Sequence, residues 1–456
     1  MFKTIIIFII SFIFSTINAS SINVPYTQLT LKNGLNVILH EDHSLPLISV
    51  NIWYHVGSSS EKSGRTGFAH LFEHILFEKS TNVPEGKFIQ WIESRGGRFN
   101  GSTTQDRTNY FEDIPSNSLE LALFLESDRM GFMLDVVTPE LVDGQREVVK
   151  NERRQRYENQ PYGSLRLALP SLLYDESHPY SWPVIGSMDD LNAASDDDVI
   201  NFYNNFYAPS NASMVIAGDF DTKETIKLIK HWFSDVPAGN DPPKISHPNP
   251  LLLNNKRVYF EDKVNLPLIH ISWLTPPFFK DGDAELDILA NILGGGKNSR
   301  LYKRLVYEEQ IVQNISVYQS SQKLSSTFNI QAFVKPGVSL DEVELKIYEE
   351  INKIFNENPS LREVQRGVNQ FEAYFIRSME MNTGYSGKAD ALNRYYFYTG
   401  EPNYFNQDLN RYLQIKPEDI SLVAKEYLSK NKVTVSIVPE GQKQIALKNS
   451  NEITTK

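Results

Sequence analysis

His70, Glu73 and His74 form an H-x-x-E-H pentapeptide within residues 67–77. On a helix the two histidines lie one turn apart on the same face. Two neutral imidazoles at that spacing can bind one zinc ion, and Glu73 lies close enough to take a proton from a water molecule. The alternative is a core helix whose histidines bond to backbone carbonyls. We favour the metal site, because the spacing supplies both ligands and a base.

Composition sets the broad class of the protein. The chain has 456 residues, too many for one ordinary core, so we expect about two to four domains. Hydrophobic residues make up 41% and charged residues 22%, as in a soluble globular protein. The net charge is −11 with no long basic run, which argues against nucleic-acid binding and modestly favours cationic peptides.

Residues 1–19 are expected to be a signal peptide. Lys3 precedes an apolar stretch at residues 5–14, and Ala19 is a small residue before a plausible cleavage point. An uncleaved anchor is the alternative. No other segment is long and apolar enough to cross a bilayer, so we expect no stable membrane insertion after cleavage. The chain has no cysteine, which excludes disulfides and thiolate ligands. Together these features favour a bacterial periplasmic or secreted protein.

The pattern of apolar residues predicts alternating strands and helices in each half of the chain. Residues 237–250 belong to a proline-rich break, with five prolines between positions 236 and 250. We therefore expect an N-terminal metal-binding domain at residues 22–236, a linker at 237–250 and a C-terminal domain at 251–445. The expected elements include a hairpin at 29–40, strands at 47–56, 99–114, 212–217, 257–260 and 269–274, and helices at 118–132, 139–157, 196–206 and 286–293.

The two halves read as a diverged repeat. Residues 191–218 and 413–439 share an acidic helix cap, an amphipathic helix, a polar turn and a β-branched strand. The offset of roughly 220 residues matches the domain size expected from length. Applied to His70, it leads to the neighbourhood of Asn291, where no metal-binding residue stands. Only one half is therefore expected to carry chemistry.

A catalytic zinc site usually takes three protein ligands and keeps one position open. The best third candidate is Glu152, in a predicted helix some eighty residues after the pentapeptide. The H-x-x-E-H helix, the helix with the V-V-x-x-E sequence that ends at Glu152, and the strand that contains Asn100 resemble the pitrilysin/insulinase family. The resemblance is greatest to its short two-domain bacterial branch, similar to mitochondrial processing peptidases, and covers residues 29–439.

The resemblance implies an α+β fold of two homologous domains, each a mostly antiparallel sheet with helices packed on one face. It implies that His70, His74 and Glu152 bind one zinc ion per chain and that Glu73 is the catalytic general base. It also implies that Asn100 helps hold an extended peptide on an edge strand. The alternative for Asn100 is an ordinary turn asparagine before glycine. Mn²⁺ or Co²⁺ could bind the same donors in vitro.

One departure from the family pattern concerns the support of the metal site. A second glutamate often stands seven residues before the third ligand, and here that position is Gln145. Because residues seven apart share a helical face, Gln145 could still hydrogen-bond behind the ligands. Glu147 faces elsewhere, and we expect it to be a solvated surface charge.

The other departure concerns the non-metal half. Active relatives carry an Arg and a Tyr, seven apart, that hold the substrate carbonyl. Here the corresponding positions are Val306 and Gln313, while Arg304 and Tyr307 are nearby but out of register. We therefore expect the zinc-bearing subunit of a peptidase that cleaves peptides or unfolded proteins in an enclosed chamber. Its expected partner is a family chain with the Arg/Tyr pair, and a homodimer is the other arrangement. A non-catalytic scaffold or peptide-binding subunit is the alternative function.

Overall fold

The computed structural model describes residues 22–454 except 244–246, 248 and 385–386, so the expected signal peptide lies outside the described residues. Two six-stranded sheets organise the chain, in the orders β1-β2-β6-β3-β5-β4 and β12-β7-β11-β8-β10-β9. Most neighbouring strands are antiparallel, but β2 pairs with β6 and β7 with β11 in parallel, as does β12 with β7. This arrangement confirms the predicted α+β fold of two similar units.

The first sheet is built from strands whose side chains alternate between two buried faces. In β2, Val37 and Leu39 join the core beneath the unit's own helices, whereas Ile38 points to the opposite face. The predicted hairpin at 29–40 is confirmed, with Gly34 in its turn at φ +93°. The strands are β1 (Thr27–Thr30), β2 (Asn36–Glu41), β3 (Leu47–Tyr54), β4 (Arg98–Thr103), β5 (Thr108–Pro115) and β6 (Ala212–Gly218).

Several helices of this unit begin at a side-chain cap, and α4 is an example. The side chain of Thr138 accepts a hydrogen bond from Leu141 N, and Pro139 occupies the first turn that follows. The stretch at 99–114 differs from the expectation, because a turn at Thr104 divides it into the hairpin β4–β5. The helices are α1 (Phe68–Ile75), α2 (Lys87–Ser94), α3 (Leu119–Phe132), α4 (Pro139–Arg153), α5 (Ser164–Leu173), α6 (Met188–Ala193), α7 (Asp196–Phe206) and α8 (Thr222–Phe233).

The second unit begins after a stretch in which the described residues form neither helix nor strand, between α8 and β7. Its strands are β7 (Lys256–Asp262), β8 (Leu268–Thr275), β9 (Val312–Ser320), β10 (Ser326–Val334), β11 (Lys432–Pro439) and β12 (Asn451–Glu452). Its helices are α9 (Asp283–Gly294), α10 (Leu340–Asn356), α11 (Leu361–Ser378), α12 (Lys388–Thr399), α13 (Phe405–Leu413) and α14 (Pro417–Leu428).

The predicted repeat is present in the strand order of the two sheets. The strand β6 lies between β2 and β3, and β11 lies between β7 and β8. Each is preceded by a helix, α7 or α14, in agreement with the shared pattern of residues 191–218 and 413–439. At one edge, the first sheet ends in β4 and the second sheet ends in β9.

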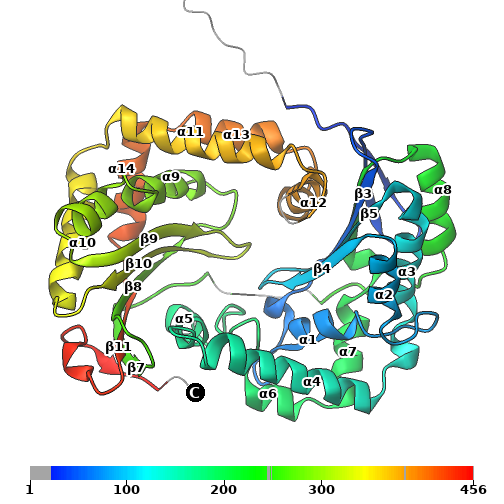
Figure 1. Ribbon diagram of the computed structural model, residues 1–456, viewed down its shortest axis with the longest axis horizontal. Coiled ribbons are helices and arrows are strands. Elements are labelled where there is room, and N and C mark those ends of the chain that lie inside the picture. The colour runs from blue at the N-terminus through cyan, green and yellow to red at the C-terminus, as the bar shows by residue number, and fades with distance from the viewer. Residues whose placement is uncertain (1–21, 244–246, 248, 385–386, 455–456) are drawn as a thin grey trace, which may run out of the picture.

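The two units exchange a helix, which the sequence did not predict. Besides its own helices on one face, each sheet receives a helix of the other unit on the opposite face (Figure 1). Leu165 and Leu173 of α5 pack with Val433 and Ile437 of β11. In the same way, Leu392 of α12 packs against the first sheet, in a cluster with Ile38, Val215 and Ala217. Hydrophobic burial therefore ties each unit to the other.

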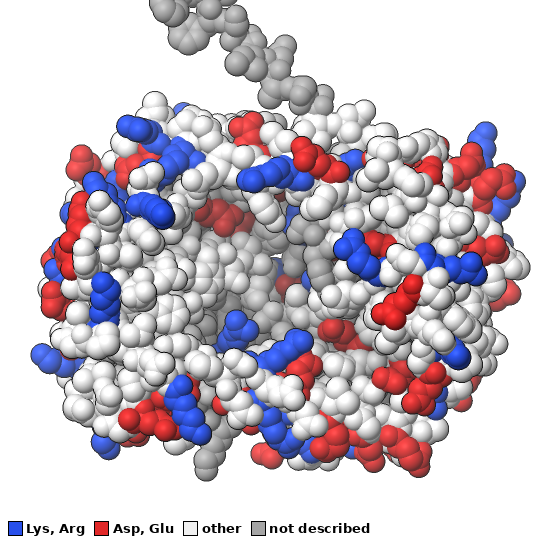
Figure 2. Space-filling model, viewed as in Figure 1, with Lys and Arg blue, Asp and Glu red and all other residues white. Residues whose placement is uncertain are grey.

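Side chains leave a hollow in the face of the molecule between the two units (Figure 2). The strand β4 and the helices α1 and α4 lie toward this hollow from the first unit, and β9 and β10 from the second (Figure 1). Of the helices in the described part of the chain, none has the length and apolar character needed to span a membrane.

Candidate metal centre

The helix α1 places the two histidines of the pentapeptide side by side. Phe68, Leu71, Phe72 and Ile75 are buried at helical spacing, which fixes one face of α1 against the core and leaves the histidine face toward α4. The ring centroids of His70 and His74 are 4.9 Å apart, and the ring planes meet at 80°. The predicted helical register of the motif is therefore present.

The N-terminus of α1 is held by a residue that the sequence reasoning missed. Its N-cap is Gly67, at φ +93°, which has no side chain to cap the helix. Glu61 takes this role: its carboxylate oxygens accept hydrogen bonds from Gly67 N at 3.0 Å and Ala69 N at 2.9 Å. Burial raises the pKa of Glu61 to about 8, against these two backbone donors. A glutamate six residues before a helix-starting glycine was the available signal.

Glu152 completes the cluster from the last turn of α4. Its Oε2 lies 3.2 Å from His74 Nε2 and 3.6 Å from His70 Nε2. One donor atom from each residue falls within 4.8 Å of the others. The hydrogen bond to His74 lowers the pKa of Glu152, which favours the carboxylate form. The structure thus brings together the three residues that the sequence singled out as ligands.

These three donors fit a zinc ion. Two imidazole nitrogens and one carboxylate oxygen are a common ligand set of catalytic zinc sites, which keep a fourth position open for water or substrate. Burial, together with neighbouring His74, lowers the pKa of His70 to about 4, so its ring is neutral near pH 7, as a metal ligand must be. The chemistry of the donor set and its closeness therefore agree with one metal ion per chain.

Glu73 lies beside the cluster, between α1 and the edge strand β4. Thr103 donates a hydrogen bond from Oγ1 to Glu73 Oε2 at 2.7 Å. Burial raises the pKa of Glu73, and this hydrogen bond opposes the rise. A Cβ added to Gly101 of β4 would lie 3.2 Å from Glu73 Cγ, so the glycine permits the close approach of strand and base. Thr103 and Gly101 were not predicted as site residues.

Asn100 lies in β4 and not in a turn, so it is not the ordinary turn asparagine that was the alternative. It is exposed, and its Oδ1 accepts a hydrogen bond from Gly101 N at 2.8 Å. Within the described part of the chain β4 pairs with β5 and ends its sheet, and its outer edge lies toward the hollow (Figure 1), where a peptide strand could align with it. A peptide contact of Asn100 itself stays a prediction.

Gln145 does not touch the three donors. Its Nε2 donates a hydrogen bond to Glu78 Oε1 at 2.8 Å, four residues beyond His74. Glu78 lies just beyond the end of α1, so this hydrogen bond joins α4 to the end of α1 and does not involve the three donors. Glu147 is an exposed partner of Lys150 at 2.6 Å, in agreement with a surface role.

A cavity of about 520 Å³ joins these features. It is lined by the pentapeptide residues His70, Glu73 and His74, by residues 100–103 of β4, and by Glu152 with the turn that follows it. A peptide bond lying along β4 would therefore pass beside both the metal donors and Glu73. The arrangement suits hydrolysis of an extended chain.

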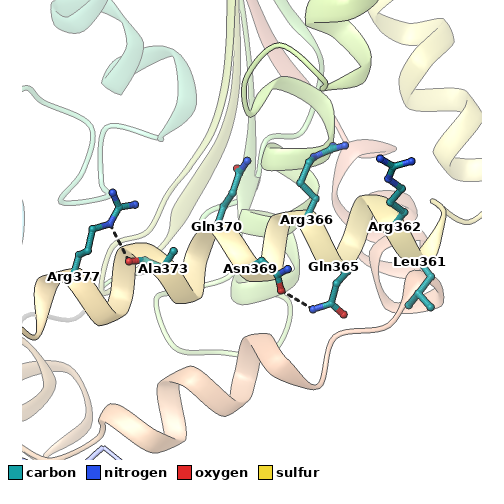
Figure 3. Close-up of a pocket in the computed structure, with 8 residues that line it drawn as sticks. All are labelled: Leu361, Arg362, Gln365, Arg366, Asn369, Gln370, Ala373 and Arg377. Carbon is teal, nitrogen blue, oxygen red and sulfur yellow. Dashed lines mark hydrogen bonds between the residues drawn. The ribbon is translucent and has the colours of Figure 1, made fainter. Parts of the chain in front are cut away.

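A larger cavity lies elsewhere, along α11, with about 990 Å³. Figure 3 shows its lining side chains projecting from one helix. The lining contains neither histidine nor carboxylate: Leu361, Arg362, Gln365, Arg366, Asn369, Gln370, Ala373 and Arg377. Size therefore does not identify the reactive site in this molecule, whereas the donor set does.

Val306 has no polar side-chain atom and so cannot donate a hydrogen bond to a substrate carbonyl, and Gln313 lies in β9. Val306 lies in a π-helical turn, η6 (Tyr302–Glu308), partly buried against the second core. Arg304 is bound by three glutamates and so cannot replace the expected arginine: its nearest approaches are to Glu309, Glu349 and Glu350 at 2.8, 2.5 and 2.9 Å. Tyr307 is 75% exposed on the same turn.

Comparison with known proteins agrees with this geometry. A family model described as insulinase, peptidase family M16, matches residues 36–180, and one described as the peptidase M16 inactive domain matches residues 193–371. The zinc protease PqqE of Helicobacter pylori is 28% identical over 428 residues, which cover 92% of this chain and 94% of that protein.

Solved structures have the same fold. The crystal structure of a protease from Helicobacter pylori has a TM-score of 0.81 and 26% identity, and covers 91% of this chain and 99% of that one. The first half of the periplasmic protease PqqL from Escherichia coli has a TM-score of 0.75 at 19% identity, with 93% of each chain covered. The match to the whole of PqqL covers only 49% of that protein. The chain belongs to the pitrilysin family of peptidases, family M16, in its two-domain form.

Proposed function

We propose that this protein is a zinc-dependent endopeptidase and supplies the metal-bearing subunit of a two-chain assembly. The observation that carries the proposal is the convergence of His70, His74 and Glu152 beside a half-buried Glu73, in a cavity that β4 also lines. Relatives named zinc proteases match more than nine-tenths of the chain, which supports the same reading.

Zinc bound by these residues would make a coordinated water acidic enough to ionise near neutral pH and would polarise the peptide carbonyl. Glu73 would take a proton from the water as its oxygen bonds to the carbonyl carbon, and would deliver that proton to the amine nitrogen as the carbon–nitrogen bond breaks. Its burial favours proton uptake, since it raises the pKa, and the Thr103 hydrogen bond fixes one of its two oxygens.

The substrate backbone is proposed to align with the outer edge of β4. Main-chain hydrogen bonds there would hold an extended peptide with little regard to sequence. Asn100, exposed on that strand, is proposed to contact the bound peptide. Substrates are accordingly peptides or unfolded protein segments, because a folded chain does not offer a free extended strand.

A second two-domain chain is proposed to complete the chamber. The match to PqqL covers about half of that protein, which is consistent with two such units in one assembly. Val306 and Gln313 favour a partner that brings the Arg and Tyr, so a heterodimer is preferred over a homodimer. The domain limits proposed for this subunit are residues 22–236 and 251–445, joined by 237–250.

We also propose that the protein acts in the bacterial periplasm or outside the cell, after removal of residues 1–19. The composition of those residues supports export. The similar Escherichia coli protein is described as periplasmic. Mass spectrometry of the protein from a periplasmic fraction would test both points, and an intact N-terminus in the cytoplasm would contradict them.

The direct test of catalysis is Glu73→Gln. The variant should retain one zinc per chain by elemental analysis, because Glu73 is not among the three converging donors. Its peptide hydrolysis should fall by about 10²- to 10⁴-fold, the usual contribution of a general base. Zinc loss equal to that of a histidine variant would show that Glu73 is a ligand instead.

The divided site has a separate test. The chain alone should bind zinc but cleave peptides slowly, since loss of one carbonyl donor typically costs about 10²- to 10³-fold. A family chain with the Arg/Tyr pair and no H-x-x-E-H should restore the rate and form a one-to-one complex by light scattering. Full activity of the isolated chain, unchanged by the partner, would refute this part of the proposal.

A non-catalytic scaffold or peptide-binding subunit is the second candidate, and Val306 with Gln313 is the observation that favours it. This reading expects zinc-independent peptide binding and no turnover with any partner. Peptide turnover that disappears with a chelator and returns with zinc would exclude it.

A further inference from the structure

The cavity beside the metal donors carries a positive charge that neither the ligand set nor the general base explains. Of the residues that line it, Arg156 is the only cation. It lies in a π-helical turn, η4 (Arg154–Glu158), which directly follows α4 and Glu152. Short π-helical turns within helices occur often at functional sites, because they re-aim one side chain. In this chain the π-helical turn places the side chain of Arg156 at the cavity.

The contacts of Arg156 leave most of its guanidinium available. Its Nη1 lies 2.8 Å from Glu152 Oε1, the oxygen that does not face the histidines. The side chain is nevertheless 74% exposed, and within the described parts of the chain no other ion pair or hydrogen bond of the guanidinium is found. A guanidinium has five N–H donors, so one contact leaves a pair free for a second carboxylate.

A second arginine, Arg166, lies on α5, which packs against the π-helical turn that carries Arg156. Arg166 is exposed, and no carboxylate of the described residues lies within 4.0 Å of it. Burial raises the pKa of Tyr157, and the positive charges of Arg166 and then Arg156 oppose that rise, so Tyr157 lies near both. Arg166 acts in the same way on Tyr318 of β9, which places it toward the hollow between the units.

The negative charges of the cavity lining are already engaged. Glu152 is held by both histidines and Arg156, and Glu73 is held by Thr103. The remaining lining is polar along residues 100–103 of β4 and apolar at Val184 and Ile185. Figure 2 likewise shows Lys and Arg side chains at the lower edge of the central hollow, where Figure 1 places α4 and α5. A guanidinium with N–H donors to spare binds a carboxylate through two parallel hydrogen bonds, and Arg156 keeps such donors beyond its contact with Glu152.

We propose that Arg156 and Arg166 form a carboxylate-binding subsite beside the metal centre, so that preferred substrates present an acid close to the scissile bond. This inference rests on the proposed peptidase function and names its substrate class. The carboxylate is either an Asp or Glu side chain or the free C-terminus of a peptide. The separation of about 3.3 Å per extended residue limits the acid to a few residues from the bond that is cut.

The proposed subsite favours acidic peptides, whereas the net charge of the chain favours cationic ones. The chain as a whole carries −11, which would attract cationic peptides from a distance. Screening confines that effect to about a Debye length, whereas a paired arginine acts at contact. Local recognition by Arg156 and Arg166 is therefore expected to decide which peptide binds at the site.

The test measures binding by the full chain, zinc-loaded and carrying Glu73→Gln so that no peptide is cut. A neutral fluorescent host peptide is scanned with single Glu, Gln or Lys residues, and affinity is followed by fluorescence anisotropy. Glu at one position or two adjacent positions should bind about fivefold to tenfold more tightly than Gln there, and high salt should reduce the difference. Peptides that end at that position as a free acid or as an amide distinguish the C-terminal source.

Arg166 is the discriminating variant, because Arg156 also touches a metal donor. Arg166→Gln should remove most of the preference for Glu, Arg166→Lys should restore part of it, and Arg166→Glu should favour Lys instead. The matched control is Arg362→Gln, which removes an exposed arginine of α11, a helix on the opposite side of the molecule from α1 and α4 (Figure 1). It should leave the preference for Glu in place.

The outcomes separate this inference from the proposed function. Equal binding of Glu and Gln peptides at every position, with the neutral host still bound, would overturn the subsite alone. A preference for Glu that survives both Arg166→Glu and Arg156→Gln would also overturn it. Failure of every peptide to bind the zinc-loaded protein would overturn the subsite and the proposed peptidase function together.

Discussion

The two units of this protein share a scaffold but place different side chains where its helices cross. In the first unit, α1 and α4 bring His74 and Glu152 to 3.2 Å of each other. In the second, α9 and α11 bring Asn291 Nδ2 to 2.6 Å from Gln370 Oε1. This hydrogen bond joins two neutral amides, which are weak donors for zinc. The same crossing therefore supports a metal site or a structural hydrogen bond, and a few side chains decide which.

Removal of a metal donor should give the largest difference between the units. His74→Ala should lower zinc affinity by more than about 100-fold, since even changes behind the ligands typically cost about 10- to 100-fold. Asn291→Ala, in the corresponding helix, should leave zinc content unchanged. Elemental analysis after dialysis against a weak chelator measures both. Zinc loss in the Asn291 variant would mean that the second unit also binds metal.

The register of α4 can be tested with two glutamates five residues apart. Glu152→Gln should weaken zinc binding by about 10-fold or more, because it removes the charged oxygen that faces both histidines. Glu147→Gln should change it little, because that side chain is exposed beside Lys150. Both variants should keep the circular dichroism of the parent. Equal loss of zinc would show that the wrong face of α4 has been assigned.

The helix exchange predicts that a cavity in one unit weakens the other. Leu392→Ala in α12 removes a fully buried side chain from the cover of the first sheet, and should lower the free energy of unfolding by about 2–5 kcal/mol. Hydrogen exchange should rise in β2 and β6, which belong to the other unit. If hydrogen exchange rose only within residues 251–445, the expectation that each unit stabilises the other would be contradicted. The exposed Leu422 offers a matched control, and its replacement by Ala should have little effect.

The smallest expected effect is on the stability of the protein at acidic pH. Burial lowers the pKa of His270 in β8 to about 4, so below about pH 6.5 the unfolded chain binds a proton that the folded chain does not. Stability is therefore complete above pH 6.5 and falls as the pH drops toward 4, by about 2 kcal/mol at pH 5 from this residue. In metal-free protein, His270→Leu should flatten that slope in denaturant titrations. An unchanged slope would exclude His270 as its source.

The elements of the fold could largely be predicted from the sequence, because their signals are local. The alternation in β2 and β6 and the caps at Thr138 and Ser195 depend on neighbouring residues only. The exchange of α5 and α12 could not, since an apolar helix face does not say which sheet it will cover. The same limit explains the missed turn near Thr104, where the residues read as one extended stretch.

The candidate site divides in the same way. His70, Glu73 and His74 are set by spacing within one helix, and Glu152 could be chosen because a resemblance supplied the second helix. Arg156 could not be placed in advance, since its position depends on a π-helical turn with no sequence signature of its own. Gln145 was expected near the ligands from helical periodicity, but its actual partner, Glu78, depends on how α1 ends.

The exchange of α5 and α12 also governs the order in which this chain can mature as it is made. When residue 236 has emerged, every strand of the first sheet exists, but the face formed by Ile38, Val215 and Ala217 still lacks its cover. That cover arrives more than 150 residues later, with α12 (Lys388–Thr399). Until then the nascent chain exposes an apolar sheet surface, to which a chaperone that holds unfolded chains would bind. Premature termination between the units would therefore leave an aggregation-prone fragment and not a smaller enzyme.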